Sequence, residues 1–312
     1  MERKLSFLHL KEILSDDCVF IGNDKLEFTG IQSVYESQLG DVTWVKPGVR
    51  DEKTLINQTD ASCILCTKDS FEHFQGSLDQ KLFVLHEDPK ILYLCVTKFF
   101  SGAESRWSEP TYIHETAIID AKCKIGENVK IGAYSVIGAC EIGNGTIVGE
   151  SVRIFSNVKI GNYCEIREFS SIGGKGLGYY KKADGTLEHI PHIGSVVIED
   201  NVHIYPFVNI DQGTLGTTRI GKGSAIDHHV HIGHNASVGM NSILVCGTVM
   251  AGGSKVLNDC FIGGNTQIRQ KCIIGNRVIT GMGSVVVKDI PDNEVWAGNP
   301  ASFMKKTPNQ MF

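Results

Sequence analysis

The sequence predicts a mainly β protein, in which a parallel β-helix follows a small N-terminal α/β domain. An aliphatic residue returns at every sixth position over most of the chain between Ile113 and Val286, and glycine often follows it, as in Ile125-Gly126 and Ile232-Gly233. Neither the helical period of about 3.6 residues nor the two-residue period of a strand produces a repeat of six. Repeats of six are typical of a parallel β-helix, in which three short strands form a coil of about eighteen residues.

The composition indicates a soluble protein with a large core. The chain has 312 residues, 42% of them hydrophobic, and a formal net charge of −5. It contains no block of Lys and Arg, which argues against a nucleic-acid partner. The first residues lack a long apolar core and a cleavage site, and no apolar stretch approaches about 18 residues. We expect a cytoplasmic protein that does not insert into a membrane.

The N-terminal domain is expected over residues 1–100, where helix-like and strand-like segments alternate. Two segments have helical patterns, Leu8–Leu14 and Pro89–Phe100. Four others have strand patterns: Glu27–Ile31, Val42–Val45, Ala61–Thr67 and Leu82–His86. Such an alternation is typical of a small α/β domain. Residues 101–110 are polar and contain proline, which predicts a linker.

The β-helix is expected over residues 111–290, with one inserted loop at 173–197. This loop is rich in glycine and contains the pair Tyr179 and Tyr180; insertions in a solenoid leave it at a corner and often carry function. A second, shorter change of phase occurs at 211–219. The tail, residues 291–312, leaves the repeat, so it either caps the solenoid or takes part in function.

Most of the ten cysteines are expected to be reduced core residues. Six lie inside the repeat, in places that suit small apolar side chains: Cys123, Cys140, Cys164, Cys246, Cys260 and Cys272. Free cysteine is among the most buried residue types. Cys63 and Cys66 form a CxxC, but within an apolar run that predicts a buried strand and without a second pair to complete a zinc site. We therefore expect no metal.

The densest polar signal is the segment from Asp227 to Asn235, which has four histidines in seven residues. Three interpretations remain open: a metal site that uses His229 and His231, a hydrogen-bonded polar face, and acid–base catalysis by one histidine. The repeat favours His234 for catalysis, because it comes two residues after the inward Ile232 and so lies at an edge that can face a neighbour.

Gly252 follows His234 by eighteen residues, which is one coil. Stacking places its N–H about 4.8 Å along the axis from His234. A histidine base beside an unobstructed glycine amide suits acyl transfer, since the base removes a proton from the nucleophile and the amide holds the oxyanion.

The chain resembles the UDP-3-O-acylglucosamine N-acyltransferases of Gram-negative bacteria over roughly residues 5–290. The matching segments are EFTGIQSVYESQLGDVTWV in the N-terminal domain, GGKGLGYY, IPHIGSVVIEDNVHI, NIDQGTL, IGHN, VMAGG, FIGG and ITGMGSV. The resemblance implies a left-handed β-helix and a homotrimer with each site between two subunits. It also implies N-acylation of an amino sugar carried on a nucleotide, with UDP as the expected nucleotide.

The resemblance assigns roles to individual residues. His234 matches the general base, and Gly252 matches the glycine whose amide forms the oxyanion hole. Trp44 stands where the family has an aromatic residue that stacks on uracil, although ordinary packing is the alternative. Asp227 and Asn235 are candidates to orient His234. The expected substrate contacts, besides Trp44, are His228, Asn235, Tyr179 and Asp211.

Several departures bear on the acyl donor. The family's second active-site histidine is Lys271 here, His228 replaces an asparagine, and Gln212 replaces the arginine of IDRGAL. The asparagine and tyrosine that follow the uracil-stacking aromatic are absent from residues 45–50. In place of the family's C-terminal helices, the chain ends in a segment that resembles the last segment of hexapeptide acetyltransferases that use acetyl-CoA. The expected donor contacts are Gly252, Lys271, Gly281, Asn299 and Pro300.

Two enzymatic functions follow from these departures. In the first, the protein is an acetyl-CoA-dependent acetyltransferase that makes an amino sugar for a cell-surface glycan. In the second, it is the lipid A enzyme, which takes a 3-hydroxyacyl chain from acyl carrier protein. The tail and Lys271 favour the first. A third alternative is a β-helix that only binds a sugar nucleotide.

Overall fold

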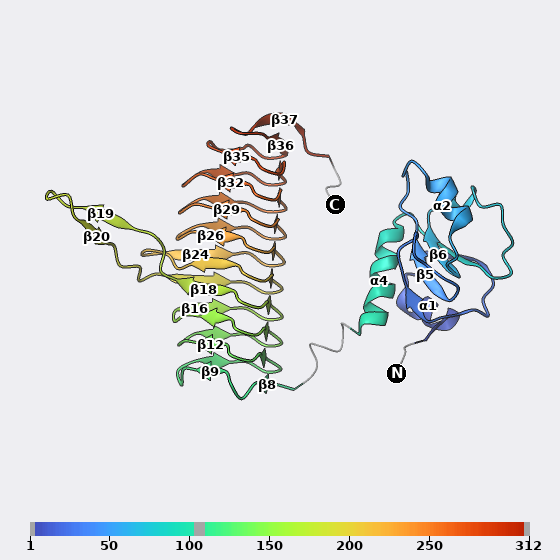
Figure 1. Cartoon of the computed structure of the whole chain (residues 1–312), viewed down its shortest axis with the longest axis horizontal. Coiled ribbons are helices and arrows are strands. Elements are labelled where there is room, and N and C mark those ends of the chain that lie inside the picture. Colours follow the sequence, from blue (N-terminus) through green and yellow to red (C-terminus); the bar gives the residue numbers. More distant parts are fainter. Residues whose placement is uncertain (1–3, 103–109, 309–312) are drawn as a thin grey trace. The chain divides into compact units, whose positions relative to one another are not determined.

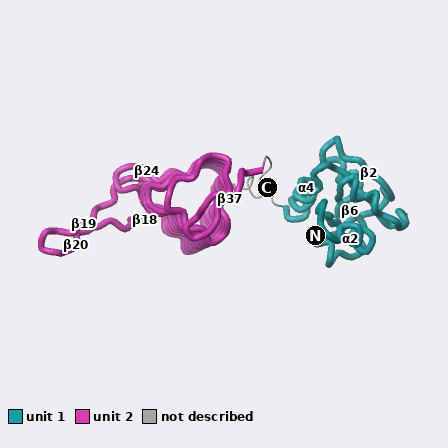
Figure 2. The backbone as a smooth tube through the Cα atoms, turned by 90° about the horizontal axis from the view of Figure 1, so that it is seen from above, with its two compact units in different colours: residues 1–106 teal, residues 107–312 magenta. Residues whose placement is uncertain are grey.

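The computed structural model describes residues 4–102 and 110–308 and divides the chain into two compact units, Met1–Arg106 and Trp107–Phe312 (Figure 2). Most of the predicted linker, residues 103–109, lies outside the described residues, as do the last four residues of the tail.

The N-terminal unit is a five-stranded sheet with helices packed against it (Figure 1). In sheet order the strands are β2 (Val19–Gly22), β7 (Leu82–Leu85), β6 (Cys63–Cys66), β5 (Asp41–Trp44) and β4 (Gly30–Ile31), and only β2 runs antiparallel to its neighbour. A second, two-stranded sheet pairs β1 (Leu5–Ser6) with β3 (Glu27–Phe28). The helices are α1 (Phe7–Ile13), α2 (Glu52–Gln58), α3 (Lys68–Phe71) and α4 (Pro89–Ser101).

The sequence pattern located most of these elements but divided one region wrongly. The segment predicted as one strand, Glu27–Ile31, is two strands in different sheets, because Phe28 pairs with Leu5 while Ile31 pairs with Val42. The pattern also missed β2, α2 and α3. The longest helix, α4, has the expected ends: Asp88 accepts a hydrogen bond from the Lys90 N–H, Pro89 begins the helix, and Gly102 ends it at φ 65°.

The second unit is the predicted left-handed parallel β-helix, whose coils are seen edge-on in Figure 1. Its three sheets are called faces A, B and C here. Face A has eight strands: β10 (Lys124–Ile125), β13 (Glu141–Ile142), β16 (Val158–Ile160), β21 (Ser195–Ile198), β24 (Thr217–Ile220), β27 (Ser237–Val238), β30 (Lys255–Val256) and β33 (Ile273–Ile274).

Face B has eleven strands: β8 (Tyr112–Ile113), β11 (Lys130–Ile131), β14 (Ile147–Val148), β17 (Glu165–Ile166), β22 (His203–Ile204), β25 (Ala225–Ile226), β28 (Ile243–Leu244), β31 (Phe261–Ile262), β34 (Ile279–Thr280), β36 (Glu294–Ala297) and β37 (Ser302–Lys306). Face C has nine: β9 (Ile118–Ile119), β12 (Val136–Ile137), β15 (Arg153–Ile154), β18 (Ser171–Gly174), β23 (Asn209–Asp211), β26 (His231–Ile232), β29 (Val249–Met250), β32 (Gln267–Ile268) and β35 (Val285–Val286).

Each coil passes through faces A, B and C in turn, and the last residue of each short strand is usually a buried aliphatic that fills the interior. Successive coils pair in parallel at a spacing of eighteen residues, as Ile232 does with Met250. Ile210 pairs with Ile232 at a spacing of 22, because four extra residues bulge out between β23 and β24. This bulge is the second change of phase seen in the sequence.

The corners that join the faces depend on residues that adopt left-handed backbone angles. Asn235, Gly253 and Lys271 follow one another at the corner from face C to face A, with φ of 61°, 70° and 62°. Asparagine and glycine adopt this conformation at low cost. The C–A corner and the corner from face B to face C, the B–C corner, carry the candidate functional residues.

Just before many strands lies a small buried polar residue that links two coils. Ser224 Oγ donates to the Gly239 carbonyl at 2.7 Å, and Ser242 Oγ donates to the Leu257 carbonyl at 2.8 Å. Cys260 occupies the same place, with Sγ 3.0 Å from the Gly275 carbonyl, and burial raises its pKa to about 11. Cysteine therefore replaces serine here and is more than a space-filling apolar residue.

One cysteine was placed wrongly from the sequence. Cys246 is exposed at the B–C corner, because it lies two residues after the inward Leu244 and so points outward. The buried prediction fits Cys140, Cys164, Cys260 and Cys272, while Cys123 is half-buried. Cys63 and Cys66 lie in the buried strand β6, where burial raises both thiol pKa values, that of Cys66 to about 12.

The inserted loop forms a hairpin that projects from the side of the solenoid (Figure 1). Its strands are β19 (Tyr179–Lys181) and β20 (Leu187–His189), which pair antiparallel and are exposed. The predicted bounds of the loop were too wide, since Gly173 and Gly174 belong to β18 and 195–197 belong to β21.

At the C-terminal end of the solenoid, β36 continues face B and β37 pairs antiparallel to it, so the tail caps the last coil. Among the described residues, no helix is long and apolar enough to cross a membrane.

The serine-like role of Cys260 can be tested by stability. We expect Cys260→Ser to change the free energy of unfolding by less than about 1 kcal/mol, because a hydroxyl makes the same bond to the Gly275 carbonyl. Cys260→Leu should cost about 1–3 kcal/mol through overpacking. Urea unfolding followed by circular dichroism measures both. Equal stability of the two variants would contradict the role.

Candidate active site

The candidate site lies on the C–A corner, where His234, Gly252 and Lys271 occupy successive coils. The Gly253 N–H donates to the His234 carbonyl at 2.8 Å, and the Lys271 N–H donates to the Gly252 carbonyl at 3.2 Å. Parallel stacking thus brings together three residues that are about eighteen apart in the chain. His234 and Gly252 are half-buried, and Lys271 is exposed.

Gly252 packs directly against the imidazole of His234. A Cβ added to Gly252 would lie 2.5 Å from His234 Nε2, so any residue other than glycine would displace the imidazole ring. The Gly252 N–H makes no hydrogen bond to any residue in the described part of the chain. A free amide donor therefore adjoins the ring nitrogen, as an oxyanion hole beside a base requires.

Two hydrogen-bond neighbours of Nδ1 define the tautomer of His234. The Thr214 N–H donates to Asn235 Oδ1 at 3.0 Å, which fixes the orientation of the amide group. His234 Nδ1 is 3.2 Å from the same oxygen and 3.3 Å from Thr214 Oγ1. Because an amide oxygen only accepts, Nδ1 carries the hydrogen, and Nε2 of the neutral ring is left as the basic nitrogen beside Gly252.

The bulge at 212–216 and the end of the hairpin loop form one wall of the site. The Ile193 N–H donates to the Thr214 carbonyl at 2.9 Å, and the Gly194 N–H donates to the Gly213 carbonyl at 3.0 Å. The buried Gln212 side chain donates to the His192 carbonyl. Gln212, at the family's arginine position, therefore ties the loop to the bulge.

Gly176 lies over a group of three polar side chains. A Cβ on Gly176 would come within 3.1 Å of Asp211 Oδ2 and 3.2 Å of both His192 Nε2 and His234 Cβ. The buried Asp211 accepts a hydrogen bond from Asn209 Nδ2 at 2.8 Å. A row of ring contacts continues from His234 through His192 and His189 to Tyr179, with centroid separations of 5.3, 5.8 and 5.3 Å. The structure thus brings Asp211 beside the site and Tyr179 to its outer end.

Asp227 and His228 lie elsewhere, on the B–C corner. Asp227 Oδ1 is 2.7 Å from His228 Nδ1, and Oδ2 accepts from the Cys246 N–H at 3.0 Å. Burial alone would raise the pKa of Asp227, but these hydrogen bonds hold it below its usual value. The expectation that Asp227 orients His234 is wrong within one chain, because the six residues between them span face C. Asn235 and Thr214 take that place.

The predicted donor residues are divided between the same two corners. Gly252 and Lys271 are on the C–A corner, whereas Gly281 follows β34 on the B–C corner, three coils beyond Asp227 and so about 14 Å along the axis. Asn299 and Pro300 are exposed in the turn between β36 and β37, where the Val285 N–H donates to the Gly298 carbonyl. One chain does not gather all five residues.

In the N-terminal unit, Trp44 is half-buried at the end of β5, with its ring 5.7 Å from that of Tyr93 on α4. This contact gives Trp44 a packing role, and stacking on a uracil stays a prediction.

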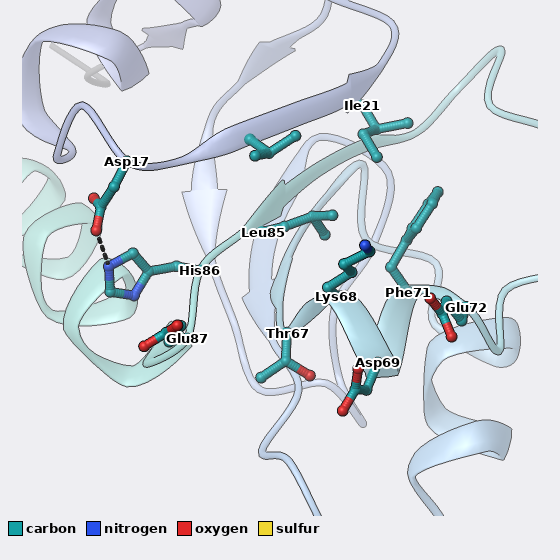
Figure 3. Close-up of a pocket in the computed structure, with 11 residues that line it drawn as sticks. Asp17, Ile21, Thr67, Lys68, Asp69, Phe71, Glu72, Leu85, His86 and Glu87 are labelled. Atoms are coloured by element: carbon teal, nitrogen blue, oxygen red, sulfur yellow. Dashed lines mark hydrogen bonds and ion pairs between the residues drawn. The ribbon is translucent and has the colours of Figure 1, made fainter.

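A separate pocket of about 800 Å³ lies at the carboxyl ends of β6 and β7, with Phe71 and Leu85 among its apolar walls and an Asp17–His86 pair at its rim (Figure 3). Trp44 does not line it.

The histidines once considered for metal binding make other contacts. His229 stacks on Phe207 with centroids 5.0 Å apart, while His231 Nδ1 lies 3.0 Å from Asn209 Nδ2. The described residues contain no group of three or more metal-ligating side chains. Sequence reasoning missed His192 and Thr214, although each lies within one of the two breaks in the six-residue phase, which could have directed attention there.

Comparisons with known proteins agree with this architecture. The family model for the bacterial transferase hexapeptide, with six repeats, matches residues 122–156. UDP-N-acetylglucosamine O-acyltransferase from Moraxella catarrhalis is 31% identical with a TM-score of 0.57, over 62% of this chain and 74% of that one. UDP-N-acetylglucosamine acyltransferase from Francisella novicida is 28% identical with a TM-score of 0.58, over 62% and 70%. The Bacteroides fragilis UDP-N-acetylglucosamine acyltransferase is 26% identical with a TM-score of 0.53, over 61% and 73%.

The chain therefore belongs to the hexapeptide-repeat family of bacterial transferases, and its solved relatives identify it as an acyltransferase of that family.

The contact between Gly252 and His234 gives a test of the site. Gly252→Ala should lower kcat at least about 100-fold, because the methyl group displaces the base from beside the amide. Gly264→Ala is the matched control: it also lies two residues after a strand, but its added Cβ meets nothing closer than 3.3 Å. Steady-state kinetics measures kcat for both variants, and their melting temperatures show whether folding is preserved. A fully active Gly252→Ala protein would contradict the site.

Proposed function

We propose that the protein is an N-acyltransferase that acylates the amine of a nucleotide-linked amino sugar for a cell-surface glycan. UDP is the expected nucleotide and acetyl-CoA the expected donor. The observation that carries the proposal is the free Gly252 N–H directly beside the basic nitrogen of His234.

The reaction follows from this geometry. The amine must be neutral to attack, so His234 Nε2 takes a proton from it as the C–N bond forms at the thioester carbonyl. The Gly252 N–H donates to the developing oxyanion. The tetrahedral intermediate then collapses, the C–S bond breaks, and the proton held by His234 goes to the leaving thiolate. Amide and free thiol are the products.

Asn235 and Thr214 serve the base and not the substrate in this mechanism. Their contacts keep the hydrogen on Nδ1 and stabilise the imidazolium that forms at His234. Among the remaining substrate candidates, Asp211 adjoins the site through Gly176 and Tyr179 lies at the end of the row of rings. His228 is on the other corner, so it reaches a site only from a second copy.

A homotrimer provides that second copy. The B–C corner carries a stack of exposed aromatic rings on successive coils, Phe169 on Phe207 at 5.1 Å and Phe207 on His229 at 5.0 Å. Exposed aromatic groups of this kind are common in interfaces. With this corner against the C–A corner of a neighbour, Asp227, His228 and Gly281 join His234, Gly252 and Lys271.

The donor then lies along the cleft between two copies. Lys271 stands one coil beyond Gly252, where its ammonium can contact a phosphate group, and Asn299 and Pro300 form the turn at the capped end. The resemblance of the tail to acetyl-CoA-dependent acetyltransferases and the presence of Lys271 favour acetyl-CoA as the donor. The alternative, favoured by the resemblance in residues 5–290, is the lipid A enzyme with 3-hydroxyacyl carrier protein as donor.

O-acylation is a second candidate, favoured by the names of the solved relatives, which act on UDP-N-acetylglucosamine. Their match covers 62% of this chain, a share close to that of the β-helix unit. N-acylation is preferred because the resemblance to the N-acyltransferases extends through the N-terminal domain.

The deciding experiment compares acceptors and donors. The protein is incubated with a UDP-amino sugar or UDP-N-acetylglucosamine, each with acetyl-CoA or a 3-hydroxyacyl carrier protein, and products are identified by mass spectrometry. We expect an amide from the amino sugar and acetyl-CoA. An amide only with the carrier protein supports the lipid A alternative, and an ester on UDP-N-acetylglucosamine supports O-acylation. No product from any pair contradicts the enzymatic proposal.

His234→Ala should lower kcat about 10²- to 10⁴-fold with the oligomer intact, because the general base is lost. Size-exclusion chromatography and melting temperature serve as the controls for folding. Unchanged activity would exclude His234 as the base, and would support the alternative of a β-helix that only binds a sugar nucleotide.

The trimer can be tested at the B–C corner. Phe207→Glu should shift the protein from trimer to monomer and abolish turnover, because it places charges in an aromatic interface. Tyr163→Glu, at an exposed position on the corner from face A to face B, is the control. Sedimentation velocity measures the distribution. A trimeric and active Phe207→Glu protein would contradict this interface.

A further inference from the structure

His192 has a buried ring nitrogen without a partner. The residue is 3% exposed, and its Nδ1 lies 3.0 Å from the Ile190 carbonyl. Its Nε2 is the one fully buried side-chain nitrogen or oxygen among the described residues that makes no hydrogen bond. Buried polar atoms of folded proteins nearly always have a partner, so this atom needs an explanation.

The missing partner must be a hydrogen-bond donor. A carbonyl only accepts, so the Ile190 carbonyl requires the hydrogen on Nδ1 of His192. Nε2 of the neutral ring therefore presents a lone pair. Hydroxyl and amine groups are the donors that an amino sugar carries.

The unpartnered nitrogen lies within the candidate site. The His192 and His234 rings are 5.3 Å apart at 75°, and the position of a Cβ on Gly176 is 3.2 Å from His192 Nε2 and 3.1 Å from Asp211 Oδ2. An acceptor nitrogen and an acidic acceptor group thus face the same point beside the base. Such a pair suits a sugar that bears adjacent donor groups.

Two glycines lie close to this nitrogen. Gly176 and Gly178 lie over the His192 ring, and a Cβ on Gly178 would come 3.0 Å from His192 Cε1. Nε2 is fully buried, so a ligand reaches it only if a neighbouring group moves, and Gly176 and Gly178 carry no side chain that would have to be displaced.

We propose that His192 is a specificity-determining residue that accepts, through Nε2, a hydrogen bond from a hydroxyl or amine of the acceptor sugar. This inference rests on the proposed sugar-nucleotide substrate. His192 is not the base, because Gly252 adjoins His234. With a hydroxyl or amine of the sugar hydrogen-bonded to His192 Nε2 and Asp211, the sugar is held so that its reacting amine lies at His234.

The test compares His192→Phe, which keeps a ring but removes the acceptor, with His192→Gln, whose amide oxygen can accept in its place. Tyr180→Phe is the control, since Tyr180 lies on the exposed hairpin of the same loop but is not part of the row of rings. Calorimetry measures the Kd of the UDP-amino sugar and of UDP alone, and kinetics measures the KM of sugar and acyl donor separately.

For His192→Phe we expect the Kd and KM of the sugar nucleotide to rise at least about tenfold, while the Kd of UDP and the KM of the donor stay within twofold. His192→Gln should recover most of the loss, and Tyr180→Phe should match the wild type. Unchanged sugar affinity in His192→Phe overturns the inference, as does an equal loss for UDP and for the sugar nucleotide. If the wild type binds no sugar nucleotide, the proposed function itself fails.

Discussion

The parallel pairing of coils at a spacing of eighteen residues is the constraint on which the structure depends. Each coil bonds to the next through its main chain, so a residue's place on a face or corner is repeated one coil on at a rise of about 4.8 Å. His234 and Gly252 meet only because of this register. The interior aliphatic residues and the serine, threonine and cysteine bonds between coils hold it in place.

Two interruptions convert a uniform prism into a site. The bulge at 212–216 brings Thr214 to Nδ1 of His234, and the excursion at 175–194 brings His192 and Gly176 over the base. Neither segment can form a regular coil of the solenoid, because each adds residues beyond the eighteen that a coil contains. Rigid coils therefore set the position of the base and the amide, while the loops supply the groups that orient and select.

The sequence could predict the residues that obey the period. The inward aliphatic residues, the phase of His234 and its distance of one coil from Gly252 all follow from counting in sixes. Counting also misled: Asp227 is close to His234 in the chain, but one face of the prism separates them. Cys246 shows the same effect, because a shift of two residues from Leu244 turns a core position into an exposed corner. His192 could not be found in this way, since the inserted loop has no register with the coils.

The central claim is that an acyl group is transferred to an amine at the C–A corner, with His234 as the base and the Gly252 N–H as the donor to the oxyanion. A crystal structure of the protein with its N-acylated sugar nucleotide product tests it most directly. We expect the amide oxygen within hydrogen-bond distance of the Gly252 N–H and the amide nitrogen beside His234 Nε2, both about 3 Å away. A product bound away from this corner, or one whose amide oxygen lies far from the Gly252 N–H, would contradict it.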